Sequence, residues 1–417
     1  MSLFADLLTT VFERRWRPGA APDADDRSAE ELAEAVVGAK AEGRGLAAAR
    51  GILERYAGWE DARKLAFFRY MAGEMTLSPE ALREALAAYE AGQSRASYGA
   101  VMAAAEPRRQ ELIRRLNQAP GATRALVEMR ADLLRLGRGE DALMALDLDF
   151  QHLFRSWFNR GFLVLRPINW ESPAHILEKI IAYEAVHDIG GWDDLRRRLQ
   201  PSDRRCFAFF HPAMPDEPLI FVEVALTRGV PGSIQALLAD ERAAIRAGEA
   251  DAAAFYSISN CQAGLAGISF GNSLIKQVAA DLAMELPGLE TFVTLSPIPG
   301  FGKWLAGTGL SPEGDDAVRA LAAHYIAEAK RDGGAPLDPV ARFHLGNGAA
   351  VHAVHAGADT SDKGLAQSRG AMVNYIYDLP KVAERQDRFA AAQEVAVSDE
   401  VKALCADAKP MLEEAKA

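Results

Sequence analysis

The chain has 417 residues, 49% of them hydrophobic and 25% charged, which is enough for two globular domains. Its net charge of -11 argues against a general nucleic-acid-binding surface but does not exclude a local basic pocket for an anionic ligand. Cys206, Cys261 and Cys405 show no C-x-x-C spacing, which disfavours a zinc knuckle and suits a reducing compartment. No apolar run approaches the roughly 20 residues of a membrane span, and the first residues lack the pattern of a secretory signal. We therefore expect a cytoplasmic protein that binds neither membranes nor nucleic acid.

Residues 1 to about 155 have the apolar spacing of helices almost throughout. Ser28 followed by Glu31 predicts a capping box at the start of one helix. Ser78 with Pro79 predicts the start of another helix, which should end at Gly92. The segment has no clustered His or Cys residues, so residues 1–155 are predicted to form an all-helical bundle domain that serves as a scaffold or oligomerisation surface.

From residue 156 onwards, short β-rich runs alternate with helical patterns. The runs are FLVLRPI, CFAFFHP, PLIFVEVAL, AAFYSIS, TFVTLSPI, AVHAVHAG and GAMVNYIYDL. Helices are predicted in AHILEKIIAYEAVH, SIQALLADERAAIRAG, GNSLIKQVAADLAMEL and DDAVRALAAHYIAEAKRDG, and again after Pro380. This alternation predicts a second domain, residues 156–417, in which helices surround one mixed sheet.

Three glycines, Gly264, Gly267 and Gly271, lie between the run AAFYSIS and a helix expected to begin near Asn272. A helix N-terminus offers free N–H groups to an anion, and glycine lets the backbone approach a phosphate closely. The spacing fits neither a P-loop, since Asn272 follows Gly271, nor a dinucleotide-binding turn, since Ala266 stands at the second glycine position. From the local sequence alone, a tight turn without a ligand therefore remains an alternative.

Longer segments carry a family resemblance. QAGLAG, residues 262–267, looks like the Q-x-x-G-x-G/A signature of GCN5-related acyltransferases, with Ala266 replacing the middle glycine. The segments GFLVLRPINWESPAHILEKIIAYEAVHDIGGWDDLRRRL, TLSPIPGFGKWL and FHLGNGAAVHAVHAGADTSDKGLAQSRGAMVNYIYDL strongly resemble the malonyl-CoA decarboxylase family. The resemblance extends from about Phe158 to Leu379.

This resemblance implies an N-terminal helical domain followed by a GCN5-acyltransferase-like α/β domain. It also implies decarboxylation of malonyl-CoA to acetyl-CoA and CO2, and a homo-oligomer, expected to be a tetramer, built through the helical domain. The residues expected to bind the CoA substrate are Gln262, Gly264, Leu265, Ala266, Gly267, Ile268, Ser269, Phe270, Gly271 and Asn272, together with Ser296 and His344. The chain departs from the family at Ser269, where animal members carry an acidic residue.

Loss of CO2 from malonyl-CoA leaves an enolate, and the thioester carbonyl accepts the electron pair, so neither a metal nor an organic cofactor is required. The resemblance implies that Ser296 binds the substrate carboxylate or the reacting carbonyl and that His344 donates a proton to the enolate carbon. It further implies that Tyr377 supports this pair by a hydrogen bond. A histidine suits proton transfer because its ordinary pKa is near 6.5. Asn347 and Asn374 are further candidate polar supports.

Structural alternatives exist for each of these residues: Ser296 in a serine turn, His344 as a structural histidine and Tyr377 as an aromatic packed on the sheet. A serine hydrolase is disfavoured, because Thr294 and Ile298 occupy the glycine positions of the G-x-S-x-G elbow.

A metal site at His352 and His355 is also disfavoured, since residues three apart on a strand face opposite sides. Two alternatives remain for the function as a whole: a CoA-dependent acyltransferase and a non-enzymatic acyl-CoA-binding sensor.

Overall fold

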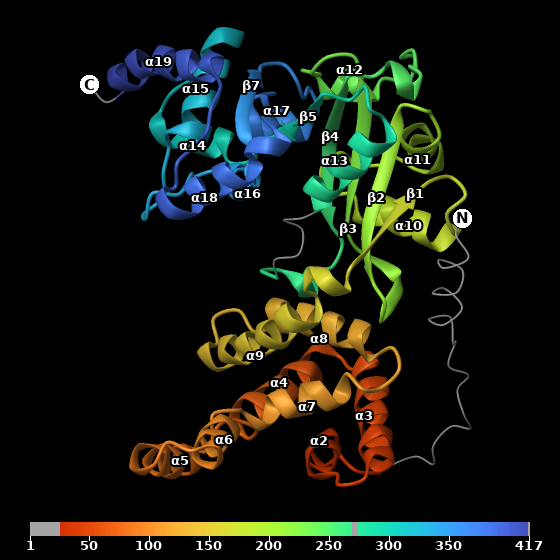
Figure 1. Ribbon diagram of the computed structural model, residues 1–417, viewed down its shortest axis with the longest axis vertical. Helices are drawn as coiled ribbons and strands as arrows, with labels where there is room; N and C mark the ends of the chain where they lie inside the picture. The colour runs from red at the N-terminus through yellow and green to blue at the C-terminus, as the bar shows by residue number, and fades with distance from the viewer. Residues whose placement is uncertain (1–25, 269–273, 416–417) are drawn as a thin grey trace. The chain divides into compact units, whose positions relative to one another are not determined.

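The structure is a computed structural model that describes residues 26–268 and 274–415 (Figure 1). The chain divides into two compact units. The helical unit contains the described residues from 26 to 164, together with Phe210–Glu217 and the turn that begins at Gln262. The sheet unit contains Leu165–Phe209, Pro218–Cys261 and the described residues from 274 onwards. The two units are therefore interleaved along the chain.

The helical unit confirms the predicted helical texture of the first part of the chain. Its helices are α2 (Ala29–Gly38), α3 (Glu42–Ala57), α4 (Asp61–Gly73), α5 (Pro79–Ala91), α6 (Arg95–Ala104), α7 (Arg108–Leu116), α8 (Ala122–Leu136) and α9 (Asp141–Trp157). Ser28 and Glu31 form the expected capping box. Ser78 caps α5, Pro79 is its first residue and Gly92 follows its last. Local side-chain chemistry therefore determines these helix ends.

The sheet unit is built on one mixed sheet of eight strands. The strands are β1 (Val164–Ile168), β2 (Arg204–His211), β3 (Met214–Thr227), β4 (Ala252–Asn260), β5 (Thr291–Thr294), β6 (Ser296–Pro297), β7 (Ala350–His355) and β8 (Met372–Ile376). Their order is β1-β2-β3-β4-β5-β8-β6, and β7 also pairs with β8. The β4–β5 pair is parallel, whereas β3–β4 and β5–β8 are antiparallel. The prediction of a helical region followed by a mixed α/β domain is confirmed.

The helices of the sheet unit are α10 (Ala174–Tyr183), α11 (Trp192–Leu199), α12 (Ile234–Leu238), α13 (Leu274–Glu285), α14 (Phe301–Thr308), α15 (Asp315–Ala327), α16 (Pro339–Gly346), α17 (Asp362–Ser368), α18 (Val382–Ala392) and α19 (Asp399–Glu414). Helices α15 and α19 pack on each other and on β7 (Figure 1). The two final helices confirm the helical stretch expected after Pro380.

One predicted helix was wrong over most of its length. The run SIQALLADERAAIRAG forms only the short α12, followed by a turn and the 3-10 segment η2 (Ala247–Glu249). The carboxylate of Asp203 binds both terminal nitrogens of Arg242, at 2.6 and 2.9 Å, and accepts a hydrogen bond from the backbone N–H of Ile245. This distant partner holds the segment in a turn, so tertiary contacts override its helical propensity.

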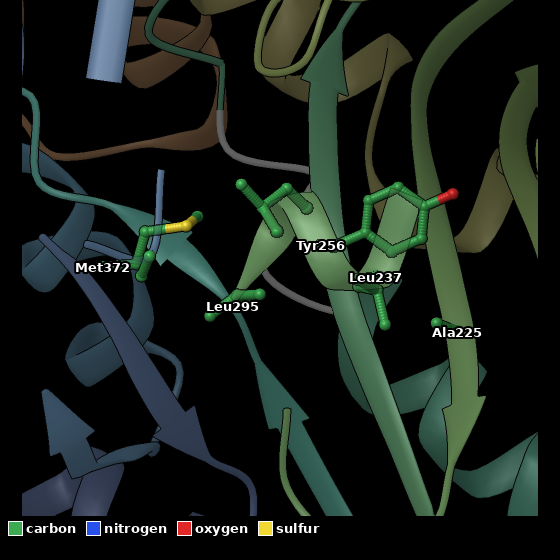
Figure 2. Packing of buried hydrophobic residues seen from close by; sticks show 7 residues of the cluster. Ala225, Leu237, Tyr256, Leu295 and Met372 are labelled. Carbon is green, nitrogen blue, oxygen red and sulfur yellow. The ribbon is translucent and has the colours of Figure 1, made fainter. Parts of the chain in front are cut away.

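A hydrophobic cluster contains Leu295, the residue that directly precedes Ser296 in the chain (Figure 2). Leu295, between β5 and β6, is fully buried in this cluster with Ala225, Leu237, Tyr256 and Met372. Burying a leucine side chain contributes about 1.5–3 kcal/mol. Successive side chains of an extended chain point to opposite sides, so this anchor directs the neighbouring Thr294 and Ser296 the other way.

Candidate active site

Ser296 lies where the chain passes from one strand partner to another. Strand β5 pairs with β4 only as far as Thr294, opposite Phe255. The next residue, Leu295, donates its backbone N–H to Phe255 O at 2.9 Å. Ser296 then pairs with Val373 of β8. The serine is therefore buried just past the end of the parallel β4–β5 pair. The residue before it is bonded to β4, and Ser296 itself pairs with β8.

His344 is carried by the last turn of α16. The helix begins at Pro339, and the buried carboxylate of Asp338 caps it by accepting a hydrogen bond from Ala341 N at 2.8 Å. The His344 imidazole is only 2% exposed, with Nε2 3.2 Å from Ser296 Oγ. Its Nδ1 lies 2.9 Å from the hydroxyl oxygen of Tyr377. The structure thus brings the three candidate catalytic residues together from β6, from α16 and from the position directly after β8.

Burial sets the charge state of this group. Loss of hydration lowers the pKa of His344 from 6.5 to about 3, because the imidazolium would have to be buried. Burial also raises the pKa of the Tyr377 phenol, since a phenolate would be buried there. Both side chains are therefore neutral at pH 7 in the ligand-free protein. An uncharged imidazole has one N–H donor and one acceptor nitrogen, so the two hydrogen bonds of His344 are complementary.

The sequence analysis missed the contact of Thr294 with Ser296, and it named Asn374 as a candidate polar support without predicting its partners. Thr294, considered only as a residue that breaks the hydrolase elbow, accepts a hydrogen bond from Ser296 Oγ at 2.8 Å. Asn374 is fully buried, donates to Thr294 O at 2.8 Å and to Pro231 O at 3.1 Å, and lies beside His355 Nε2. The Thr294 contact has a sequence signal, because residues two apart on a strand face the same side. No signal in the sequence predicts the hydrogen-bond partners of Asn374.

The two histidines considered as metal ligands make different contacts. His355 binds Asn374, and the backbone carbonyl of His352 accepts a hydrogen bond from Ser398. Strand β7 has an irregular register between Val351 and Ala353, so the regular alternation assumed for the two histidines is broken at His352. Within residues 26–268 and 274–415, no group of three or more His, Cys, Asp or Glu side chains is arranged to hold a metal ion.

The described part of the glycine turn, Gln262–Ile268, is grouped with the helical unit, whereas Ser296, His344 and Tyr377 belong to the sheet unit. The 3-10 segment η3 (Ala263–Leu265) packs on α8. Gly264 is required by this packing, because a Cβ there would overlap the carbonyl oxygen of Val127. Ser269, Phe270, Gly271 and Asn272 lie outside the described residues.

A buried ion pair supports the same turn. Arg130, on α8, donates from Nη1 to Gly264 O at 2.7 Å and from Nε to Asp147 Oδ1 at 2.6 Å. Both charged side chains are almost completely buried. Gly267, in contrast, has a φ of +75° and open space around the position of a Cβ, while Ala266 is exposed. Gly267 thus has a conformational reason to be glycine and leaves its backbone accessible.

Comparisons with known proteins agree on one family. Models of the malonyl-CoA decarboxylase N-terminal and C-terminal domains match residues 76–158 and residues 161–314 and 313–415, respectively. The mitochondrial malonyl-CoA decarboxylase of Anser anser anser is 35% identical over 355 residues, covering 71% of this chain and 69% of that protein. The Rattus norvegicus enzyme is 33% identical over 359 residues, covering 72% and 71%.

Solved structures give the same result. The malonyl-CoA decarboxylase from Rhodopseudomonas palustris aligns with a TM-score of 0.84 and 46% identity, over 90% of this chain and 100% of that one. The enzyme from Agrobacterium vitis aligns with a TM-score of 0.86 and 47% identity, over 90% of this chain and 99% of that one.

Among the described residues, no helix has both the length and the apolar character needed to cross a membrane.

Proposed function

The chain belongs to the malonyl-CoA decarboxylase family, and on that premise we propose how its buried side chains carry out the reaction. The protein converts malonyl-CoA to acetyl-CoA and CO2. The bond between the carboxylate carbon and the α-carbon breaks, and its electron pair moves into the thioester carbonyl to give an enolate. The α-carbon then takes up one proton. The observation that supports our mechanism is the hydrogen-bonded row Tyr377–His344–Ser296, buried at the end of β5.

Ser296 is proposed to bind the reacting end of the substrate. Its hydroxyl can donate to a substrate carboxylate or to the enolate oxygen. A donor aimed at a developing oxyanion typically contributes about 3 kcal/mol to the transition state. The effect depends on exclusion of water, and Ser296 is only 5% exposed. The same burial limits the directions from which the substrate can approach the Ser296 hydroxyl.

His344 is proposed to deliver the proton to the α-carbon. In the ligand-free protein its pKa of about 3 leaves it neutral. An incoming substrate carboxylate favours the imidazolium, because an opposite charge nearby raises a histidine pKa. The proton would therefore be taken up with the substrate and used after CO2 departs. The Tyr377 hydroxyl suits both states, since it can donate to a neutral Nδ1 and accept from a protonated one.

One assay tests this function against its alternatives. Purified protein is incubated with malonyl-CoA alone, and acetyl-CoA and CO2 are quantified. Formation of both products without an added acceptor is the expected result. Acyl transfer that occurs only when an amine is supplied would instead identify an acyltransferase. Binding of malonyl-CoA without turnover would identify a non-enzymatic sensor.

We propose that the reaction needs no cofactor, because the thioester can accept the electron pair itself.

We also propose a homo-oligomer, with a tetramer as the expected state, built through the helical unit. Supporting this, helices α5 and α6, which are labelled in Figure 1, contain no buried residue. The side chains of Leu86, Tyr98 and Met102 on these helices are exposed. A polar substitution of Tyr98 should then weaken the oligomer in light scattering.

A cytoplasmic location is proposed because the chain has three cysteines that are well separated in sequence, show no C-x-x-C spacing and are all buried, as suits a reducing compartment. The curated relatives are named as mitochondrial proteins, so fractionation of the native cells is the appropriate test. Recovery of the protein with a membrane-enclosed fraction would contradict the proposal.

A further inference from the structure

Ser296 Oγ has two close side-chain neighbours, Thr294 Oγ1 and His344 Nε2. Ser296 Oγ donates to Thr294 Oγ1 at 2.8 Å, and Thr294 Oγ1 also accepts from the backbone N–H of Tyr375 at 3.2 Å. A serine hydroxyl has one hydrogen to donate. With that hydrogen directed at Thr294, Ser296 can only accept in its 3.2 Å contact with His344 Nε2.

This direction determines the tautomer of His344. If Ser296 accepts, Nε2 must carry the hydrogen. A neutral imidazole then has an acceptor at Nδ1. Tyr377, 2.9 Å from Nδ1, is a phenol that retains its hydrogen at neutral pH and can supply the matching donor. The donors therefore run in one order, from Tyr377 to His344, from His344 to Ser296 and from Ser296 to Thr294.

Thr294 is held firmly enough to fix this order. Its side chain is completely buried, and its backbone pairs with Phe255 of β4. Its carbonyl oxygen accepts a hydrogen bond from the buried amide of Asn374. Its Oγ1 is tied to the backbone of Tyr375 on β8. A rotation of Thr294 away from Ser296 would leave the N–H of Tyr375 without this acceptor, a cost of about 1–3 kcal/mol for a buried group.

We propose that Thr294 is a positioning residue that keeps His344 as the Nε2–H tautomer in the ligand-free protein and prevents it from acting as a base toward Ser296. A serine nucleophile requires a histidine nitrogen free to accept its proton. In the ligand-free protein that nitrogen already carries hydrogen, and the serine hydrogen is directed at Thr294 until the substrate offers it another acceptor. The arrangement presents an N–H donor to an incoming carboxylate instead of an activated alkoxide. It deepens the proposed function, because it explains how a buried Ser–His pair avoids acylation by the CoA thioester.

The tautomer is measured directly by nitrogen-15 NMR of the histidine side chains in the ligand-free protein. The chain has eight histidines, so the signal of His344 is assigned by its loss in His344→Asn. We expect Nε2–H in the wild type and in Thr294→Ser, which retains the hydroxyl. In Thr294→Val the serine hydrogen loses its acceptor, and we expect a shift to Nδ1–H. A wild-type Nδ1–H tautomer, or an unchanged tautomer in Thr294→Val, would overturn the proposal.

A second readout follows the reactivity of Ser296. A fluorophosphonate probe should label Ser296 at least about tenfold faster in Thr294→Val than in the wild type or Thr294→Ser. Affinity for acetyl-CoA is measured in parallel to confirm folding, and Thr294→Ala replaces Thr294→Val if the latter does not fold. Equal labelling of all variants would contradict the positioning role. These measurements need no turnover, so absence of malonyl-CoA decarboxylation would count against the proposed function and leave the tautomer result standing.

Discussion

The imidazole of His344 lies nearly parallel to the ring of Tyr375, with centroids 4.5 Å apart and planes 23° apart. Tyr375 and Tyr377 both contact this histidine, but in different ways. Tyr377 binds Nδ1 through its hydroxyl. Tyr375 presents its ring face, and its buried hydroxyl has no hydrogen-bond partner among the residues that the structure describes. The two tyrosines therefore offer a matched pair of substitutions.

We expect Tyr375→Phe to keep kcat within about twofold and to leave stability unchanged or raised by about 1 kcal/mol, since it removes a buried hydroxyl without a partner. Tyr377→Phe should lower kcat by about tenfold or more, because the histidine loses its Nδ1 partner. Steady-state kinetics and urea denaturation of both variants provide the measurements. The reverse order of kcat values would show that the hydroxyl of Tyr375, and not that of Tyr377, assists His344.

Local signals account for much of the fold. The Ser28–Glu31 capping box and the Ser78 cap were predicted because each involves residues three apart. The strands were predicted because their apolar runs are short and rich in β-branched and aromatic residues. The stretch after α12 failed because its partner, Asp203, lies 39 and 42 residues away from Arg242 and Ile245. No local pattern contains that information.

In the candidate site, too, some features were predictable from the sequence and others were not. Ser296, His344 and Tyr377 were identified by resemblance to a family, not by spacing, since 48 residues separate the first two and 33 the last two. The contact of Arg130 with Gly264 joins residues 134 positions apart, so the role of α8 in supporting the glycine turn was not predictable from either segment. A buried ion pair beside a glycine becomes visible only after the chain has folded.

His344→Asn keeps a polar side chain of similar size but cannot donate a proton at neutral pH. We expect kcat to fall by about 10²-fold or more, with affinity for acetyl-CoA nearly unchanged, because the group acts mainly in the transition state. Ser296→Ala should also lower kcat. The double variant should be little worse than the poorer single variant, since the two side chains form one hydrogen-bonded unit. Wild-type turnover in folded His344→Asn would remove this residue from the mechanism.

The stability of the sheet unit should depend on pH through His344. Its pKa is about 3 when folded and 6.5 when exposed, so below pH 6.5 the unfolded chain binds a proton that the folded chain does not. The contribution of the neutral, buried His344 to the free energy of unfolding is therefore fully present above pH 6.5. This contribution is lost as the pH falls towards 3, at about 1.4 kcal/mol per pH unit.

Comparison of the wild type with His344→Asn isolates this contribution from that of other groups, such as His187, whose pKa burial lowers to about 4. Between pH 7.5 and 5.5 the stability of the wild type should fall by about 1.4 kcal/mol more than that of the variant. Hydrogen exchange of the β8 amides at the two pH values gives the measurement. Parallel pH dependences would mean that the imidazole titrates normally in the folded protein.

Removal of divalent ions should leave the activity intact. The thioester carbonyl is a sufficient electron acceptor, and His355 is already bound to Asn374. The protein is dialysed exhaustively against EDTA, and turnover of malonyl-CoA is compared with that of an untreated sample. Lost turnover that a divalent ion restores would contradict the cofactor-free proposal.

Gly267 provides a test of CoA binding at the glycine turn. Its φ of +75° lies in the left-handed region, and nothing stands within 4 Å of a Cβ built there. Gly267→Asp should weaken CoA binding by about tenfold or more, because a carboxylate at this position would repel a pyrophosphate bound at the turn. Gly267→Asn is the matched control, since asparagine has the same shape, tolerates the left-handed region comparably and carries no charge.

The dissociation constants of CoA and of pantetheine are measured for both variants. Pantetheine lacks the pyrophosphate, so its affinity should be equal in Gly267→Asp and Gly267→Asn, while CoA should discriminate between them. Equal CoA affinities would place the pyrophosphate elsewhere. An equal loss of both ligands in both variants would show that the turn requires glycine for its conformation and that charge at this position has no part in recognition.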